Sequence, residues 1–109
     1  MTAYGVRMPK IIYGTAWKKD RTASLVEQAI VMGFRGIDTA CQPKHYQEAG
    51  VGAGVAACVR CGLVTRPELY LQSKFTPLNG QDPNQIPYDP KATLSEQVAQ
   101  SFQVSLANL

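Results

Sequence analysis

Short apolar segments rich in β-forming residues alternate with helical segments along this chain. The segments KIIYGTAW (10–17), GFRGIDTA (33–40) and ELYLQSKF (68–75) each have a short apolar core that runs into polar or small residues, as buried strands do. Such alternation predicts parallel strands joined by right-handed crossovers. We therefore expect an α/β fold with about three βα units, with functional residues at the C-terminal ends of the strands.

Helix signals occupy the intervals between these strands. Residues 20–33 place Ser24 and Glu27 at the spacing of a capping box, which predicts a helix that starts there and ends at the following glycine. Residues 51–63 (VGAGVAACVRCGL) are rich in alanine and predict a second helix that stops at Gly62.

The C-terminal third of the chain combines a long loop with a last helix. Four prolines lie between residues 76 and 90, and a loop of this length is more often functional than idle. After it, Thr93 and Glu96 have capping-box spacing. An amphipathic helix is predicted from apolar residues that recur every four positions, namely Leu94, Val98, Phe102 and Leu106.

Composition places the chain among single globular domains. With 109 residues, 45% hydrophobic and 17% charged, it is long enough for one domain and too short for two. Its net charge of +3 is spread out, so no nucleic-acid footprint is expected, and no apolar run suggests a membrane span or a secretory signal. Three cysteines suit a reducing compartment, and we expect a cytoplasmic protein.

Two short motifs have structural explanations that compete with functional ones. Gly52, Gly54 and Ala57 satisfy G-x-G-x-x-A, but a polar loop separates them from the preceding strand, so small residues that pack the helix against the sheet explain them as well as a dinucleotide site does. Cys58 and Cys61 form a C-x-x-C motif without a second ligand pair, and no metal site is expected. By the same reasoning, a lone loop histidine is the default interpretation of His45.

Asp38, Tyr46 and Lys74 lie at or just after consecutive strand ends, which converge on one pocket in a parallel βα scaffold. Tyrosine is a poor acid near neutral pH, but a nearby ammonium group stabilises the phenolate. An aspartate would keep that lysine charged and in place. We therefore expect these residues to form a site in which tyrosine donates a proton.

The chain closely resembles the aldo-keto reductases. The matching segments are GTAW (14–17), GFRGIDTA (33–40), HYQEAGVG (45–52) and GLVTRPELYLQSKF (62–75), which occur in the family's order and approximate spacing. The resemblance implies a (β/α)₈ TIM barrel that binds NADPH across the C-terminal ends of its strands and reduces an aldehyde or ketone to an alcohol.

The resemblance also implies roles for individual residues. Tyr46 would be the proton donor, Lys74 would make it a stronger acid, and Asp38 would pair with Lys74 and contact the nicotinamide ribose. Gly14 and Thr15 would line the nicotinamide end of the cofactor site. Trp17 would lie near the substrate entrance, and Glu48 matches a structural position of the family.

The sequence departs from the family pattern in two places. The loop between Asp38 and Tyr46 is longer than in the commonest members, which changes the rim of the pocket more than the chemistry. The family's catalytic histidine, at the end of the next strand, has no counterpart in this chain, and His45 belongs to the tyrosine loop instead.

A closed barrel needs eight strands and about 250 residues. We therefore expect residues 1–109 to form the N-terminal portion of a barrel, without a second domain and with a strand edge through which the chain could associate. Two hypotheses remain open. The chain is part of an NADPH-dependent reductase, incomplete as it stands, or it is a truncated remnant without catalysis, at most an interaction module.

Overall fold

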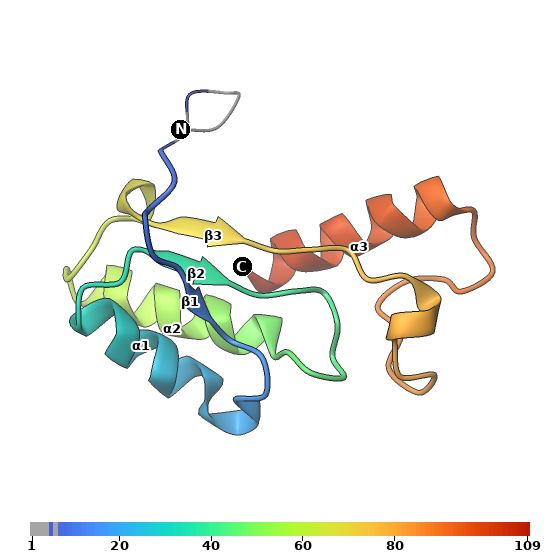
Figure 1. The fold of residues 1–109 in the computed structure, drawn as a ribbon, viewed down its shortest axis with the longest axis horizontal. Helices are drawn as coiled ribbons and strands as arrows, with labels where there is room; N and C mark the ends of the chain where they lie inside the picture. The colour runs from blue at the N-terminus through green and yellow to red at the C-terminus, as the bar shows by residue number, and fades with distance from the viewer. Residues whose placement is uncertain (1–4, 6) are drawn as a thin grey trace.

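The computed structural model describes residue 5 and residues 7–109. Its helices and strands follow one another along the chain as β1 (Tyr13–Gly14), α1 (Thr22–Val31), β2 (Gly36–Asp38), α2 (Glu48–Arg60), β3 (Tyr70–Gln72) and α3 (Leu94–Asn108) (Figure 1). Short 3-10 helices occur at Lys19–Arg21, Arg66–Glu68 and Leu78–Gly80. The predicted alternation of strands and helices is therefore confirmed.

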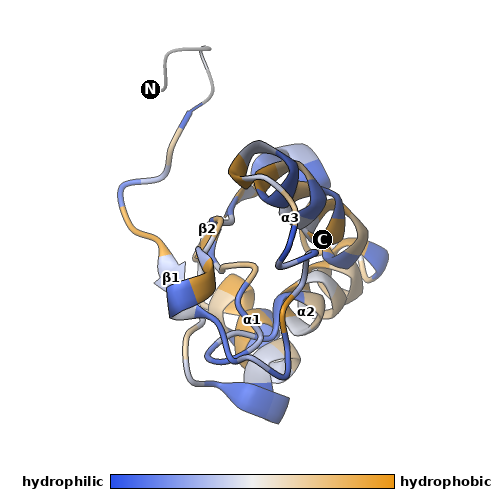
Figure 2. Cartoon of the chain, turned by 90° about the vertical axis from the view of Figure 1, so that its right-hand side faces the viewer, coloured by the Kyte–Doolittle hydropathy of each residue, from blue (hydrophilic) through white to orange (hydrophobic). Residues whose placement is uncertain are grey.

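The strands pair in parallel in the order β1-β2-β3. Gly14 lies opposite Asp38, and Asp38 lies opposite Gln72, so the C-terminal ends of the strands are aligned. The helices lie to one side of this sheet (Figures 1 and 2). Loops that leave the aligned strand ends consequently meet at one edge of the molecule.

The hydrophobic core lies between the sheet and helices α1 and α2. Its central residues are Val26 and Ile30 from α1, Ile37 from β2 and Val51 from α2, all without solvent exposure. Burial of such side chains is the main favourable contribution to folding, at about 1.5–3 kcal/mol for each large aliphatic group. Leu71 and Leu109 pack against the edge of this core.

The glycines of α2 allow close contact with other helices, which corrects the prediction that they pack the helix against the sheet. A Cβ atom at Gly54 would lie 2.7 Å from the carbonyl oxygen of Ala23 and 2.9 Å from Cβ of Val26, both in α1. A Cβ atom at Gly52 would lie 1.8 Å from the carbonyl oxygen of Asn108 in α3. The small residues therefore set the distances between helices.

The predicted starts of the first two helices are wrong by a few residues. Helix α1 begins at Thr22, and Ser24 lies inside it, where its hydroxyl accepts a hydrogen bond from Gln28 instead of capping the helix. Helix α2 begins at Glu48 and not at Val51, so Glu48, Ala49 and Gly50 form its first turn before the apolar residues. Local sequence patterns define helix termini only loosely.

Helix α3 has the predicted cap but an unexpected orientation. The Thr93 hydroxyl accepts a hydrogen bond from the backbone N–H of Glu96 at 3.3 Å, as in a standard N-cap. The side chains that α3 buries are polar, namely Gln97, Ser101 and Ser105. Its predicted apolar stripe is 42–65% exposed and consists of Leu94, Val98, Phe102 and Leu106.

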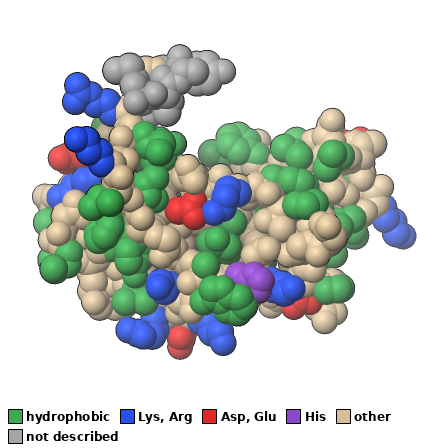
Figure 3. Space-filling view, viewed as in Figure 1, with side chains coloured by type: hydrophobic (Ala, Val, Ile, Leu, Met, Phe, Trp, Pro, Cys, Tyr) green, Lys and Arg blue, Asp and Glu red, His purple; other side chains and the backbone are tan. Residues whose placement is uncertain are grey.

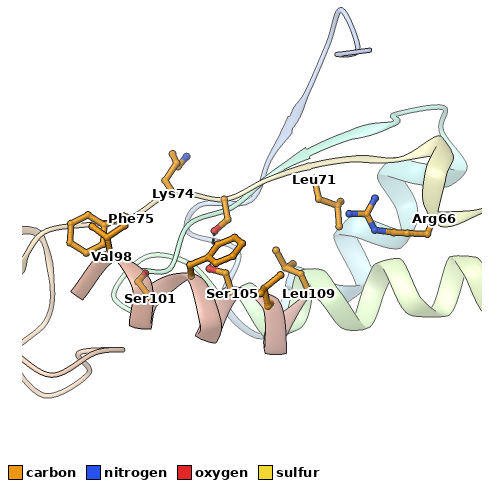
Figure 4. Close-up of a pocket in the computed structure, with 11 residues that line it drawn as sticks. Arg66, Leu71, Lys74, Phe75, Val98, Ser101, Ser105 and Leu109 are labelled. Carbon is orange, nitrogen blue, oxygen red and sulfur yellow. Dashed lines mark hydrogen bonds between the residues drawn. The ribbon is translucent and has the colours of Figure 1, made fainter. Parts of the chain in front are cut away.

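A groove of about 390 Å³ lies between α3 and the segment that contains β3 (Figure 4). Leu71 and Phe75 line one side of it, and Val98, Phe102 and Leu106 line the other. Within residues 5 and 7–109, β3 pairs with β2 alone, so its second edge faces this groove. In the part of the chain that the structure describes, none of the helices is both long and apolar enough to cross a bilayer.

Candidate active site

An ion pair joins the C-terminal ends of β2 and β3. Asp38 is the last residue of β2, and Lys74 lies just beyond the end of β3. The Nζ atom of Lys74 is 2.6 Å from Oδ2 of Asp38. Gln72 donates a hydrogen bond from Nε2 to Oδ1 of Asp38 at 2.8 Å, so both carboxylate oxygens have a partner. Gln72 was not among the residues predicted from the sequence, although its position opposite Asp38 in a parallel sheet could have indicated it.

Tyr46 approaches this ion pair from the loop between β2 and α2. The Lys74 Nζ atom lies 5.2 Å from the centre of the Tyr46 ring, within the range of a cation–π interaction. The loop is held in a turn in which the backbone N–H of Tyr46 donates to the carbonyl oxygen of Gln42 at 3.0 Å. The structure thus brings Asp38, Tyr46 and Lys74 together, with the lysine in contact with both of the others.

The surroundings of Lys74 favour its charged form. Partial burial by itself would lower the pKa of Lys74, but the hydrogen bond and the negative charge of Asp38 act in the opposite direction, together with a smaller effect of Tyr46. The net result is a pKa above the ordinary value of a lysine. Lys74 therefore stays an ammonium group at neutral pH, where it can stabilise a negative charge on the tyrosine.

This raised pKa predicts a loss of stability at alkaline pH. The stabilising effect of charged Lys74 is fully present below the pKa of an unfolded lysine, about 10.4, and disappears as the pH rises through the higher folded value. Between about pH 9 and pH 12, the free energy of unfolding should fall more steeply for the wild type than for Lys74→Met.

Urea unfolding at several pH values measures this difference. The variant Asp38→Asn is the matched control, because it removes the partner that raises the pKa of Lys74 and keeps the lysine itself. Its pH dependence should resemble that of Lys74→Met. Equal slopes in the wild type and both variants would contradict the prediction.

Gly14 and Thr15 continue the edge of the sheet beside Asp38. The Thr15 hydroxyl donates a 2.7 Å hydrogen bond to the backbone carbonyl oxygen of Asp38, and the Thr15 N–H lies 3.2 Å from the same oxygen. Thr15 is completely buried, so it orients the backbone of Asp38 and does not itself reach solvent. Gly14 leaves open space, because a Cβ atom there would meet nothing within 4 Å.

Trp17 and His45 form a stacked pair at the rim of the site. Their ring centres are 4.0 Å apart, and the backbone N–H of Trp17 donates to the backbone carbonyl oxygen of His45 at 2.8 Å. Trp17 has a φ of 64°, a left-handed conformation that is costly for a bulky residue and is compensated by these contacts. Figure 3 shows the chain's histidine at the surface, between basic and hydrophobic side chains.

The long loop that follows Thr76 is attached to this rim. His45 Nδ1 lies 3.1 Å from Oε1 of Gln42, and Gln42 Nε2 donates to the carbonyl oxygen of Gly80 at 2.8 Å. Gln81 also donates to the carbonyl oxygen of Cys41 at 3.0 Å. The contacts of this loop could not be predicted, because no local sequence pattern connects residues that are so far apart in the chain.

The C-x-x-C motif lies at the opposite end of α2 from Tyr46. Helix α2 has 13 residues and therefore a length of about 20 Å, with Tyr46 before its start and Cys58 and Cys61 at its end. Both cysteines are free thiols, and burial raises the pKa of Cys58. The motif takes no part in the site described above.

Comparison with characterised proteins gives a consistent set of relatives, although no family model matches the chain. An NAD(P)H-dependent D-xylose reductase from Pachysolen tannophilus is 37% identical over 71 residues, which is 65% of this chain and 21% of that protein. The NADPH-dependent aldose reductase of Saccharomyces cerevisiae is 33% identical over 94 residues, or 84% of this chain and 28% of the enzyme.

Solved structures resemble the fold along nearly its whole length. A Bombyx mori aldo-keto reductase in complex with NADP has a TM-score of 0.73 and 29% identity, covering 98% of this chain and 32% of the other. The aldose reductase from Schistosoma japonicum, at a TM-score of 0.72 and 22% identity, shares the fold. The matched part of the chain thus covers about a third of these structures and about a quarter of the curated relatives.

Proposed function

Because this chain belongs to the aldo-keto reductase family, we propose that it carries the proton-donating site of an NADPH-dependent oxidoreductase that reduces an aldehyde or ketone to an alcohol. The observation that carries the proposal is the position of Lys74, whose Nζ atom contacts both Asp38 and the ring of Tyr46 at aligned strand ends. The sequence similarity to NAD(P)H-dependent sugar reductases supports the cofactor and the class of substrate.

In this proposal Tyr46 is the proton donor. Its hydroxyl donates a proton to the oxygen of a bound carbonyl group, and the ammonium group of Lys74 stabilises the phenolate that remains. Asp38 keeps Lys74 in place and charged, and Gln72 in turn holds the other oxygen of Asp38. Bound NADPH would supply the hydride that the carbonyl carbon receives.

The residues present fit the nicotinamide and ribose end of such a cofactor. The Asp38 carboxylate can accept a hydrogen bond from a ribose hydroxyl, and the open space beside Gly14 lets a flat ring approach the strand end. Thr15 acts indirectly, through its bond to the backbone of Asp38. Trp17, which is 66% exposed beside His45, is placed to contact a substrate at the rim.

We propose this activity for the chain together with the rest of a barrel, because the relatives and neighbours that it matches are about three times as long. In the proposal, the groove between α3 and β3 receives the next strand of that barrel. The free edge of β3 and the apolar side chains opposite it support this occupant, because an added strand would pair with the edge and bury Val98, Phe102 and Leu106. We also propose a cytoplasmic location.

The exposed stripe of α3 favours a second candidate function, namely a non-catalytic chain that associates through the same groove. It is 42–65% exposed, which is unusual for four apolar residues on one helix face. A chain with this function would bind a polypeptide that supplies an adjacent strand and would not oxidise NADPH.

Two proteins test the proposal. One is residues 1–109 alone, and the other is a fusion of these residues with the later strands of the Saccharomyces aldose reductase, called the joined protein below. We expect NADPH to quench the intrinsic fluorescence of the joined protein, and the joined protein to oxidise NADPH with a reactive aldehyde at a saturable rate. A joined protein that folds by circular dichroism but neither binds NADPH nor reduces the aldehyde would overturn the oxidoreductase and leave the second candidate.

A further inference from the structure

Glu48 is a buried acidic residue that the proposed mechanism does not use. It is the first residue of α2 and is 5% exposed. Its carboxyl group accepts hydrogen bonds from three side chains, those of Ser73, Ser105 at 2.8 Å and Asn108 at 3.0 Å. Among the residues that the structure describes, no lysine or arginine forms an ion pair with it.

These hydrogen bonds connect Glu48 to two different elements. Ser73 belongs to the segment that leaves β3, whereas Ser105 and Asn108 belong to α3. Burying a carboxyl group costs free energy unless its oxygens are hydrogen-bonded, so moving any of the three donors away would destabilise the folded state. Glu48 therefore holds the end of β3 and the end of α3 against the start of α2.

The link to β3 reaches the lysine of the proposed site. Ser73 directly precedes Lys74, and neighbouring side chains of an extended segment point to opposite sides. Figure 4 agrees with this arrangement, because Ser105 points toward the segment from α3 while Lys74 projects from its other side. The Ser73 hydrogen bond thus helps to hold the backbone from which Lys74 extends, together with the hydrogen bond that the carbonyl oxygen of Lys74 accepts from the backbone N–H of Cys41 at 3.0 Å.

The other end of the link lies close to the tyrosine. Glu48 follows Tyr46 after a single residue and sits in the first turn of a 13-residue helix, which is a rigid support. Asp38 cannot replace this link, because it contacts Lys74 but forms no side-chain hydrogen bond with Tyr46. The Glu48–Ser73 hydrogen bond joins the segment that carries the tyrosine to the segment that carries the lysine, in addition to the contact between Lys74 and the Tyr46 ring.

We propose that Glu48 is a positioning residue that sets the approach of Lys74 to Tyr46 through Ser73. The effect of Glu48 on catalysis rests on the proposed function, whereas its effect on the distance between Lys74 and Tyr46 does not. A purely structural role predicts a different result, because Glu48 would then act by holding α3, and loss of the Ser105 or Asn108 bond would matter as much as loss of the Ser73 bond.

Nuclear magnetic resonance on residues 1–109 distinguishes the two roles. The ε-methylene protons of Lys74 lie near the Tyr46 ring, so the ring current shifts their resonance, and Tyr46→Leu gives the value without the ring. We expect Glu48→Ala and Ser73→Ala to move this resonance at least halfway toward the Tyr46→Leu value. Asn108→Ala is the matched control, since it removes one donor to the same carboxyl group from α3, and it should leave the resonance unchanged.

The variants remain informative if one of them is unstable. Ser73→Ala keeps two of the three hydrogen bonds of Glu48, so it decides the matter if Glu48→Ala does not fold. Glu48→Gln retains an oxygen acceptor and should keep more of the wild-type shift than Glu48→Ala. An equal response to Ser73→Ala and Asn108→Ala, or no response to either, overturns the inference.

A kinetic measurement connects the geometry to turnover. In the joined protein described above, Ser73→Ala should lower kcat about tenfold and leave the KM for NADPH unchanged, because Lys74 acts on the chemical step. If the wild-type joined protein has no turnover, the proposed function fails, while the resonance of Lys74 still decides whether Glu48 positions it. An unchanged kcat together with a shifted resonance would refute the importance of this positioning for catalysis.

Discussion

Replacing Tyr46 with phenylalanine is expected to lower kcat for aldehyde reduction by about 10²–10⁴-fold, the usual contribution of a positioned proton donor. The change removes the hydroxyl and keeps the ring, so the contact with Lys74 at 5.2 Å is preserved. Because the cofactor would meet Asp38 and Gly14, the affinity for NADPH should stay close to the wild-type value. Stopped-flow and steady-state measurements of NADPH oxidation in the joined protein would determine both quantities.

Tyr70→Phe is the matched control for this experiment. It makes the same chemical change in β3, but Tyr70 opens the strand, whereas Lys74 lies beyond its other end. We expect its kcat to remain within about twofold of the wild type. A Tyr46→Phe protein that keeps full turnover would show that another group donates the proton and would remove the central residue of the proposed mechanism.

The second large effect is expected in the core. Ile30→Ala should lower the free energy of unfolding by about 2–5 kcal/mol, because Ile30 is completely buried between α1 and the sheet and its truncation leaves a cavity. Domains of this size have a total stability of about 5–15 kcal/mol, so the variant should unfold at a markedly lower urea concentration.

Val31→Ala provides a control from the next position of the same helix. Val31 is 66% exposed, and alanine has the higher helix propensity, so the change should stay within about 0.5 kcal/mol of the wild type. Urea unfolding followed by circular dichroism measures both variants. Similar midpoints for Ile30→Ala and Val31→Ala would mean that the core does not lie where the structure places it.

Much of the fold could be predicted from local patterns. The strand segments around Tyr13, Ile37 and Leu71 have the short apolar cores of buried parallel strands, and all three lie in the observed sheet. Helix termini were less predictable, as the start of α1 at Thr22 shows, because capping signals such as that of Ser24 compete with the packing of the helix. The C-terminal stops near Gly33 and Gly62 were clearer, since both glycines adopt the positive φ that favours this residue.

The residues of the candidate site could be proposed from the sequence, but the hydrogen bonds and contacts between them could be predicted only in part. Asp38 and Lys74 follow neighbouring strands, and parallel pairing forces the ends of such strands together. The role of Glu48 could not be predicted in the same way, because a hydrogen bond between Glu48 and Ser73 depends on how α2 packs beside β3. The same holds for the stack of Trp17 on His45, which depends on a left-handed backbone at Trp17.

The alternation of strands and helices could be predicted from the sequence, because periodicity and strand ends are local properties of the chain. The resemblance of its motifs indicated the family, and the proposal that Asp38, Tyr46 and Lys74 form the site rests on strand ends and on that resemblance. The buried side of α3, in contrast, could be identified only from the packing of the folded chain. Amphipathic periodicity would place Leu94, Val98, Phe102 and Leu106 inward, yet Gln97, Ser101 and Ser105 are buried instead. The physical reason is that the buried carboxyl group of Glu48 needs hydrogen-bond donors, which the polar side of α3 provides. The apolar side of α3 consequently faces the open groove beside β3.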